Sequence, residues 1–231
     1  MSLIGPPKDY SEMLNKIFVF TFFGSLICTY LVSLASPAVS SYLNKFSIAV
    51  EILGLSVPIA YVVPPLLIAI LARIIKLHDK ISDLFRIRET FDITEILVPM
   101  AGESNFSTSL KVLEYFKKHR RDIMNAVFYK YASSKKPLID SHMIEMALDR
   151  WFWFWVLIES LVIGAITLVT LMFMGGYQIA AWLACFLFAG TLLASFVNRV
   201  CARAAHEEVQ AILADQARKS EIKAVFDALQ I

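Results

Sequence analysis

The residue whose chemistry most needs explaining is Glu159, because it is the single formal charge inside four long apolar stretches of the chain. A bare carboxylate in hydrocarbon is costly, and such residues usually mark an ion path, a proton relay or a partner. Glu159 lies eight residues into the third stretch, roughly 12 Å along a helix. No basic residue lies inside the stretches to neutralise it. We expect either a functional carboxylate or a protonated one that is hydrogen-bonded between helices.

Two further sets of residues in these stretches have types that suit a pore or a gate. The first stretch carries hydroxyl side chains at every fourth residue, on one face of a helix: Thr21, Ser25, Thr29 and Ser33. These hydroxyls either line a narrow polar pore or pack closely against another helix, which small hydroxyl residues also favour. Pro58 and Pro64 interrupt the second stretch. Proline removes a backbone hydrogen bond and kinks a helix, so these positions predict either a gate or an inert kink.

Outside the stretches, the most distinctive feature is a basic segment from Lys111 to Lys136 with a local net charge of +6. Its candidate anion-binding residues are Lys111, Lys117, Lys118, Arg120, Arg121 and Lys130. Such a segment binds anionic lipid headgroups, or a phosphorylated ligand such as a nucleotide, or it is a solvated positive face without a ligand. We do not expect it to bind double-stranded DNA directly.

The signatures of known catalytic sites are missing from the sequence. It contains no GxGxxG, Walker loop, GxSxG, HExxH or CxxC pattern, and these are the spacings that nucleotide, serine and zinc chemistry use. Its four histidines are dispersed without metal-ligand spacing, and we interpret its three cysteines as reduced thiols. We therefore expect no enzyme activity, no cofactor and no metal.

The apolar stretches define the elements that must position these residues. Of the 231 residues, 58% are apolar and 18% are charged, against roughly 45–50% and 25% in soluble domains, which argues against an ordinary soluble enzyme. Each stretch reaches the roughly 17–25 residues that a membrane-spanning helix needs, whereas barrel strands would be shorter and alternating. The fold class is therefore an all-α integral membrane protein with four transmembrane helices. The predicted spans are Ile17–Ser36, Ile52–Ala72, Trp151–Met174 and Tyr177–Asn198.

The distribution of Lys and Arg predicts the orientation. With both termini in the cytoplasm, 21 of the 22 basic residues lie on that side, in agreement with the positive-inside rule, and we expect a multi-pass protein of the cell (inner) membrane. The chain then divides into an N-terminal segment with two spans (1–72), a basic cytosolic insert (73–150), a hairpin of two spans (151–198) and a cytosolic tail (199–231).

The apolar periodicity of the insert and the tail predicts further helices. The second span is expected to run straight into the insert as one helix. Ser107 and Asp140 are expected to cap later helices, because their side chains accept backbone N–H groups at a helix start. We expect the insert and the tail to form a helical bundle.

This order of two spans, a basic helical insert, two spans and a helical tail resembles the small membrane effectors of bacterial anti-phage defence systems. The basic segment and the hydroxyl face of the first span carry the resemblance, together with the architecture of the whole chain. In those families a cytosolic module senses a nucleotide-type signal or a partner protein, and the membrane part opens a pore or disrupts the bilayer. The resemblance implies a ligand-gated, homo-oligomeric ion channel among membrane lipids, which we expect to be a tetramer. The alternatives are a membrane-anchored sensor or scaffold that docks a soluble partner and, third, a small proton-coupled transporter.

Overall fold

The structure is a computed structural model that describes residues 5–45, 48–52 and 55–229. Within these residues the regular secondary structure is helical apart from one two-stranded hairpin, and the chain divides into two compact units. The first, here called the membrane unit, contains residues 14–78 and 153–196. The second, here called the insert–tail unit, contains residues 1–13, 79–152 and 197–231.

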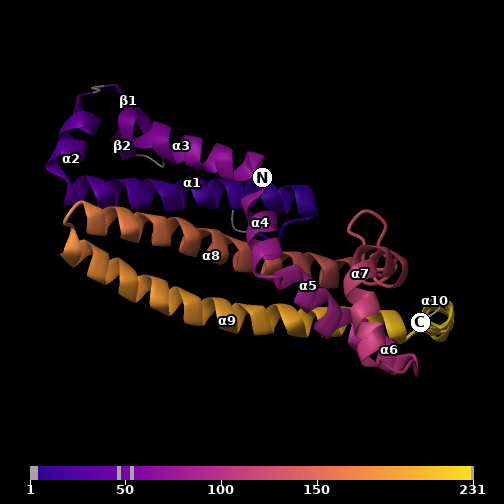
Figure 1. The fold of residues 1–231 in the computed structure, drawn as a ribbon. Coiled ribbons are helices and arrows are strands. Elements are labelled where there is room, and N and C mark those ends of the chain that lie inside the picture. Colours follow the sequence, from indigo (N-terminus) through magenta and orange to yellow (C-terminus); the bar gives the residue numbers. More distant parts are fainter. Residues whose placement is uncertain (1–4, 46–47, 53–54, 230–231) are drawn as a thin grey trace. The chain divides into compact units, whose positions relative to one another are not determined.

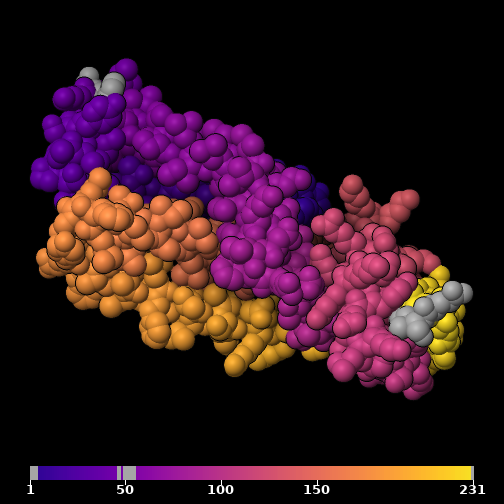
Figure 2. Space-filling model, in the orientation of Figure 1, coloured from indigo at the N-terminus to yellow at the C-terminus, as the bar shows by residue number. Residues whose placement is uncertain are grey.

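Among the described residues, three helices are long and apolar enough to cross a membrane: α1 (Tyr10–Ala35), α8 (Ser141–Phe173) and α9 (Tyr177–Leu213). Between α8 and α9, Gly175 has a φ of +75° and the N–H of Gly176 donates to the carbonyl of Leu171 at 2.9 Å. Glycine adopts this left-handed conformation without strain, so the turn ends α8 cleanly. Within the membrane unit, α8 and α9 then lie side by side, as the orange segments show in the ribbon (Figure 1) and in the space-filling view (Figure 2).

The second predicted span, Ile52–Ala72, is wrong at its start. Ile52 ends strand β1 (Ala49–Ile52), which pairs antiparallel with β2 (Leu55–Pro58), and helix α3 (Ile59–Ile74) begins only after this hairpin. A short apolar run is compatible with either a strand or the first turns of a helix, so hydropathy alone did not separate them. Pro58 directly precedes α3, whereas Pro64 lies inside it.

The expectation that this helix runs straight into the insert is also wrong. α3 stops at Ile74, Lys76 has a positive φ of 52°, and α4 (Leu77–Leu84) continues at a bend of 59°. Apolar periodicity predicted both helices but not the break, because lysine is an ordinary helix former. The two helices pass the test for a membrane span only as a bent pair, so a fourth span depends on taking them together.

Short helices pack around an apolar core in the insert–tail unit. After α4 come α5 (Ile87–Phe91), a π-helix η1 (Asp92–Leu97), α6 (Val98–Glu103) and α7 (Leu110–Val127), and the tail adds α10 (Gln216–Asp227). Phe226 of α10 is fully buried, with its ring centroid 5.6 Å from that of Phe106 and 5.8 Å from that of Phe116. The tail therefore packs onto the insert.

Helix starts in this unit follow the capping chemistry of their side chains. The predicted cap Asp140 is confirmed, because its carboxylate accepts the backbone N–H of His142 at 3.0 Å, just before α8 begins. The predicted cap Ser107 is wrong, because Ser109 accepts the N–H of Val112 at 3.4 Å and starts α7. The two serines have the same capping chemistry, so local sequence did not choose between them.

Candidate functional site

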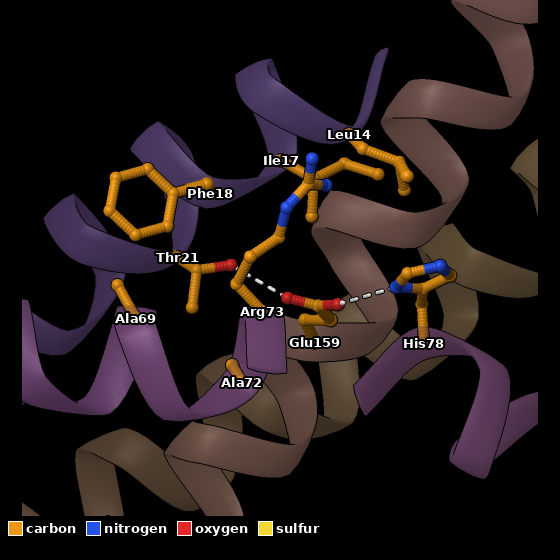
Figure 3. Close-up of a pocket in the computed structure, with 9 residues that line it drawn as sticks. All are labelled: Leu14, Ile17, Phe18, Thr21, Ala69, Ala72, Arg73, His78 and Glu159. Carbon is orange, nitrogen blue, oxygen red and sulfur yellow. Dashed lines mark hydrogen bonds and ion pairs between the residues drawn. The ribbon is translucent and has the colours of Figure 1, made fainter. Parts of the chain in front are cut away.

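Glu159 lies in the interior of the membrane unit, where two other polar side chains approach it. The hydroxyl of Thr21 on α1 donates a hydrogen bond to its Oε2 at 2.7 Å. His78, at the start of α4, places Nδ1 3.7 Å from its Oε1. Glu159 and Thr21 are 3% exposed and His78 is 4% exposed. The carboxylate is thus enclosed between a hydroxyl and an imidazole (Figure 3).

A small cavity beside Glu159 has mixed walls. Its volume of about 10 Å³ is room for a single water molecule. One end is polar, because Arg73 enters it and donates from Nη2 to the Oδ1 of Asn15 at 3.1 Å. The lining residues are Leu14, Ile17, Phe18, Thr21, Ala69, Ala72, Arg73, His78 and Glu159, all drawn in Figure 3.

The geometry suits a contact whose strength depends on protonation. At 3.7 Å the imidazole of His78 and the carboxylate of Glu159 are too far apart for a direct hydrogen bond, but a protonated imidazole at this distance forms an ion pair. Trp155 packs edge-on against His78, with ring centroids 6.1 Å apart, which limits how the imidazole turns.

His78 and Arg73 were not predicted as neighbours of Glu159, because the predicted second span ended at Ala72. No basic residue lay inside the predicted spans, whereas the bend after Ile74 places His78 against the carboxylate. The sequence did contain one signal: the apolar periodicity continues beyond the predicted span, which predicts a helix for these residues too. This periodicity does not show that the chain bends and turns the side chain of His78 toward the span.

The hydroxyl face of α1 is also inside the membrane unit. Ser25 and Ser33 are 0% and 5% exposed, and the hydroxyl of Thr29 donates to the backbone carbonyl of Ser25 at 2.9 Å. Beside them α1 approaches α8 closely, because a Cβ on Gly24 would lie 3.8 Å from the hydroxyl of Ser160. In the single chain this face packs against α8, which favours the packing alternative over an open pore.

Other residues considered in the sequence lie away from this cavity. Pro58 and Pro64 do not line it. Within the described part of the chain, no three side chains of metal-ligating type are grouped so that they would hold an ion.

In the insert–tail unit, the predicted anion-binding residues separate into paired and exposed ones. Arg120 forms an ion pair with Asp92 of η1, and Lys130 forms one with Glu221 of α10. The other four are exposed, and no ion pair with a described residue holds them: Lys111, Lys117, Lys118 and Arg121. We call these four residues the basic face of α7.

The Asp92–Arg120 pair is largely buried, with 7% of the Asp92 side chain and 15% of the Arg120 side chain exposed. Burial raises the pKa of Asp92 to about 6, although Arg120 and Arg88 both act to lower it. α7 is irregular next to the pair, because His119 has non-helical φ and ψ of −111° and 20°. Asp92 opens the π-helix, a rare geometry that is frequent at functional sites. Two irregular helices therefore meet at one ion pair.

Comparison with known proteins identifies a family whose model matches nearly the whole chain. The model of the YmfE protein family matches residues 9–227. The chain is 25% identical over 179 residues to a protein of Escherichia coli (strain K12) called uncharacterized protein YmfE, and the match covers 74% of this chain and 73% of that protein. No solved structure matches. The family match includes residues of both units, so it extends over the whole architecture.

Proposed function

We propose that this chain, which belongs to the YmfE protein family, is a homo-oligomeric channel-type effector of the inner membrane, opened through its insert–tail unit by a phosphate-bearing ligand or a partner protein. In this proposal the bent pair α3–α4 is the second of four spans, and both termini lie in the cytoplasm. The observation that carries the proposal is the buried carboxylate of Glu159, held by Thr21 and His78. Burying ionisable groups in an apolar unit is a poor way to gain stability, so a functional role explains it better.

The pair of His78 and Glu159 supports gating because of where His78 lies in the chain. It follows the break at Lys76 by two residues, at the start of the helix that leads into the insert. An imidazolium–carboxylate attraction holds α4 against α8, and losing either charge weakens that contact. A signal that moves α4 would act on the same contact. Four helices are too few to enclose a conducting path comfortably, so we place the pore between subunits.

Ion flux through liposomes containing the purified protein tests this function. We expect flux that depends on a phosphate-bearing ligand such as a nucleoside triphosphate. Glu159→Gln and His78→Gln should change that flux by about tenfold, within the range of typical coupling between sites. The matched control is His142→Gln, since His142 is exposed at the start of α8, and its flux should equal that of the wild type. Liposomes that remain impermeable with every ligand would contradict the channel.

A proton-coupled transporter is the second candidate, and the 3.7 Å approach of His78 to Glu159 is what favours it. A transporter would accumulate a solute against its gradient when a pH gradient is imposed, whereas a channel would only dissipate gradients. If instead Glu159→Gln leaves activity intact and a stoichiometric soluble protein co-purifies, the sensor or scaffold alternative replaces both.

A role in anti-phage defence completes the proposal, and its support is the architecture of two spans, basic insert, two spans and tail. Plating phage on cells that express the wild-type chain or Glu159→Gln tests it. Protection by the wild type and not by the variant is the expected result. Equal plaque counts with and without the chain, across a broad phage panel, would remove this part of the proposal.

A further inference from the structure

We propose that Asp92 is a built-in competitor for the phosphate-bearing ligand: its carboxylate occupies the Arg120 guanidinium, and an incoming phosphate group takes its place. This inference rests on the proposed function, since it assumes that the basic face of α7 attracts such a ligand. Arg120 then becomes a specific ligand-binding residue, and Asp92 is the residue that must release it.

Arg120 is placed to serve either partner. It follows Lys117 and Lys118 by one helical turn or less and directly precedes Arg121, so it lies at the edge of the basic face. Its side chain is 15% exposed and the Asp92 side chain is 7% exposed. Arg120 is therefore the more accessible partner of the pair, while the carboxylate that neutralises it is the more buried one. In the proposal, an anion that arrives at the basic face reaches Arg120 before Asp92.

The electrostatic surroundings of Asp92 favour exchange with a stronger anion. Arg88 also acts on Asp92 but is engaged with Asp79 at 3.2 Å, so Arg120 is the ion-pair partner of Asp92. Of the other titratable groups, Tyr129 is influenced by both Asp92 and Arg120. A phosphate group offers more negative charge than one carboxylate, and its geometry matches the guanidinium in a bidentate contact. Exchange would thus replace a weak intramolecular anion with a stronger external one.

The elements that hold the two residues are suited to such an exchange. Asp92 begins a π-helix, and Arg120 directly follows the residue at which α7 departs from helical geometry. η1 and α7 pack against each other, so releasing the ion pair changes the contact between two irregular segments. Local irregularity of this kind is common where a segment has two arrangements. The structural effect of ligand binding would in this way be transmitted from the surface of α7 to η1.

The alternative is an ion pair that serves folding alone, and a charge-matched pair of variants separates the two. Asp92→Asn and Asp122→Asn each remove one negative charge near the basic face, but Asp122 is exposed and forms no ion pair with a described residue. In the full-length protein in detergent, binding of inorganic tripolyphosphate is measured by calorimetry, and binding to phosphatidylglycerol vesicles is measured by co-flotation. The two probes distinguish a free phosphate ligand from a lipid headgroup.

We expect Asp92→Asn to tighten binding of one probe by about tenfold, within the usual range for coupled sites, and Asp122→Asn to change it less than twofold. Arg120→Gln should weaken binding, and adding Asp92→Asn to Arg120→Gln should then have no further effect. Equal effects of the two Asn variants would overturn the inference while leaving ligand binding, and so the proposed function, intact. Absence of binding to both probes in the wild type would overturn the inference and would remove the phosphate-bearing ligand from the proposed function, leaving a partner protein as its trigger.

A measurement on the wild-type protein covers the case in which Asp92→Asn does not fold. Saturating tripolyphosphate or vesicles should accelerate amide hydrogen exchange in Asp92–Leu97, because the ion pair that holds the first residue of η1 is released. The same ligand should leave exchange in α10 unchanged. Slower or unchanged exchange in η1 on binding would overturn the competitor role.

Discussion

At the scale of the single residue, Arg120 decides whether a buried charge is tolerated. The pKa of Asp92 is raised to about 6 from its usual 3.8, so the folded protein binds that proton more tightly than the unfolded chain does. The stabilisation that follows is complete below about pH 4 and is lost as the pH rises through 6. Above pH 6 the charged carboxylate depends on its guanidinium partner.

Arg120→Gln should therefore destabilise the protein at pH 8 much more than at pH 5. Without the guanidinium the pKa of Asp92 rises further, and at pH 8 the buried carboxylate lacks its ion-pair partner, at a cost of about 3–5 kcal/mol. At pH 5 Asp92 is protonated in both proteins, so the difference is small. Thermal unfolding at the two pH values measures this, with Arg121→Gln as the control because Arg121 is exposed on the same helix. A loss of stability that is the same at both pH values would contradict the prediction.

The sequence identified Glu159 but not its partners, and the reason is physical. A lone charge in an apolar stretch stands out in any single sequence, since its residue type and the apolar residues around it are enough to recognise it. Its partner His78 is distant in the chain, and only the bend between α3 and α4 brings the imidazole of His78 next to the carboxylate of Glu159. In the same way, the basic segment was visible, but the sequence did not show that Asp92 neutralises one of its arginines.

At the scale of the element, the turn between α8 and α9 depends on a glycine for space. A Cβ at Gly176 would lie 2.7 Å from the Cβ of Ala35 and 3.4 Å from the carbonyl oxygen of Leu171. Neither atom belongs to a flexible side-chain end, so the backbone of α1 or of the turn would have to move.

Gly176→Ala should accordingly destabilise the protein by about 1–3 kcal/mol, the usual cost of overpacking. Gly102→Ala is the matched control, because nothing lies within 4 Å of a Cβ there and alanine favours a helix by up to about 1 kcal/mol. In detergent, the midpoint of thermal unfolding should therefore be lower for Gly176→Ala than for the wild type, and unchanged or higher for Gly102→Ala. An unchanged midpoint for Gly176→Ala would show that α1 shifts at no cost.

Helices with a long apolar period were predicted well, and breaks in that period were not. α1, α8 and α9 contain the predicted first, third and fourth spans almost entirely. The hairpin before α3 and the break at Lys76 depend on tertiary packing and on one residue in a left-handed conformation. A lysine carries no local signal for that conformation, so periodicity continued across it.

At the scale of the whole molecule, the proposed orientation places α2 (Pro37–Asn44) on the periplasmic side of the inner membrane and the insert on the cytoplasmic side. Tyr42 is 61% exposed on α2, and Lys136 is exposed in the segment before α8. On intact cells with a permeable outer membrane, a membrane-impermeant maleimide should label Tyr42→Cys and not Lys136→Cys, and both should react after lysis. The wild type reports labelling of the native cysteines. The reverse pattern would invert the topology.

In the proposed four-span topology, the short length of α3 would make the bilayer itself an input to this protein. Its 16 residues extend about 24 Å, less than the roughly 30 Å of the hydrocarbon core, whereas the 26 residues of α1 exceed that thickness. In that topology, lipid beside α3 would be under hydrophobic mismatch, which thinning of the membrane or a change in the 59° bend would relieve. A thick membrane would then favour a straighter α3–α4 pair and a thin one the bent pair, so acyl-chain length would act directly on the joint that presents His78 to Glu159.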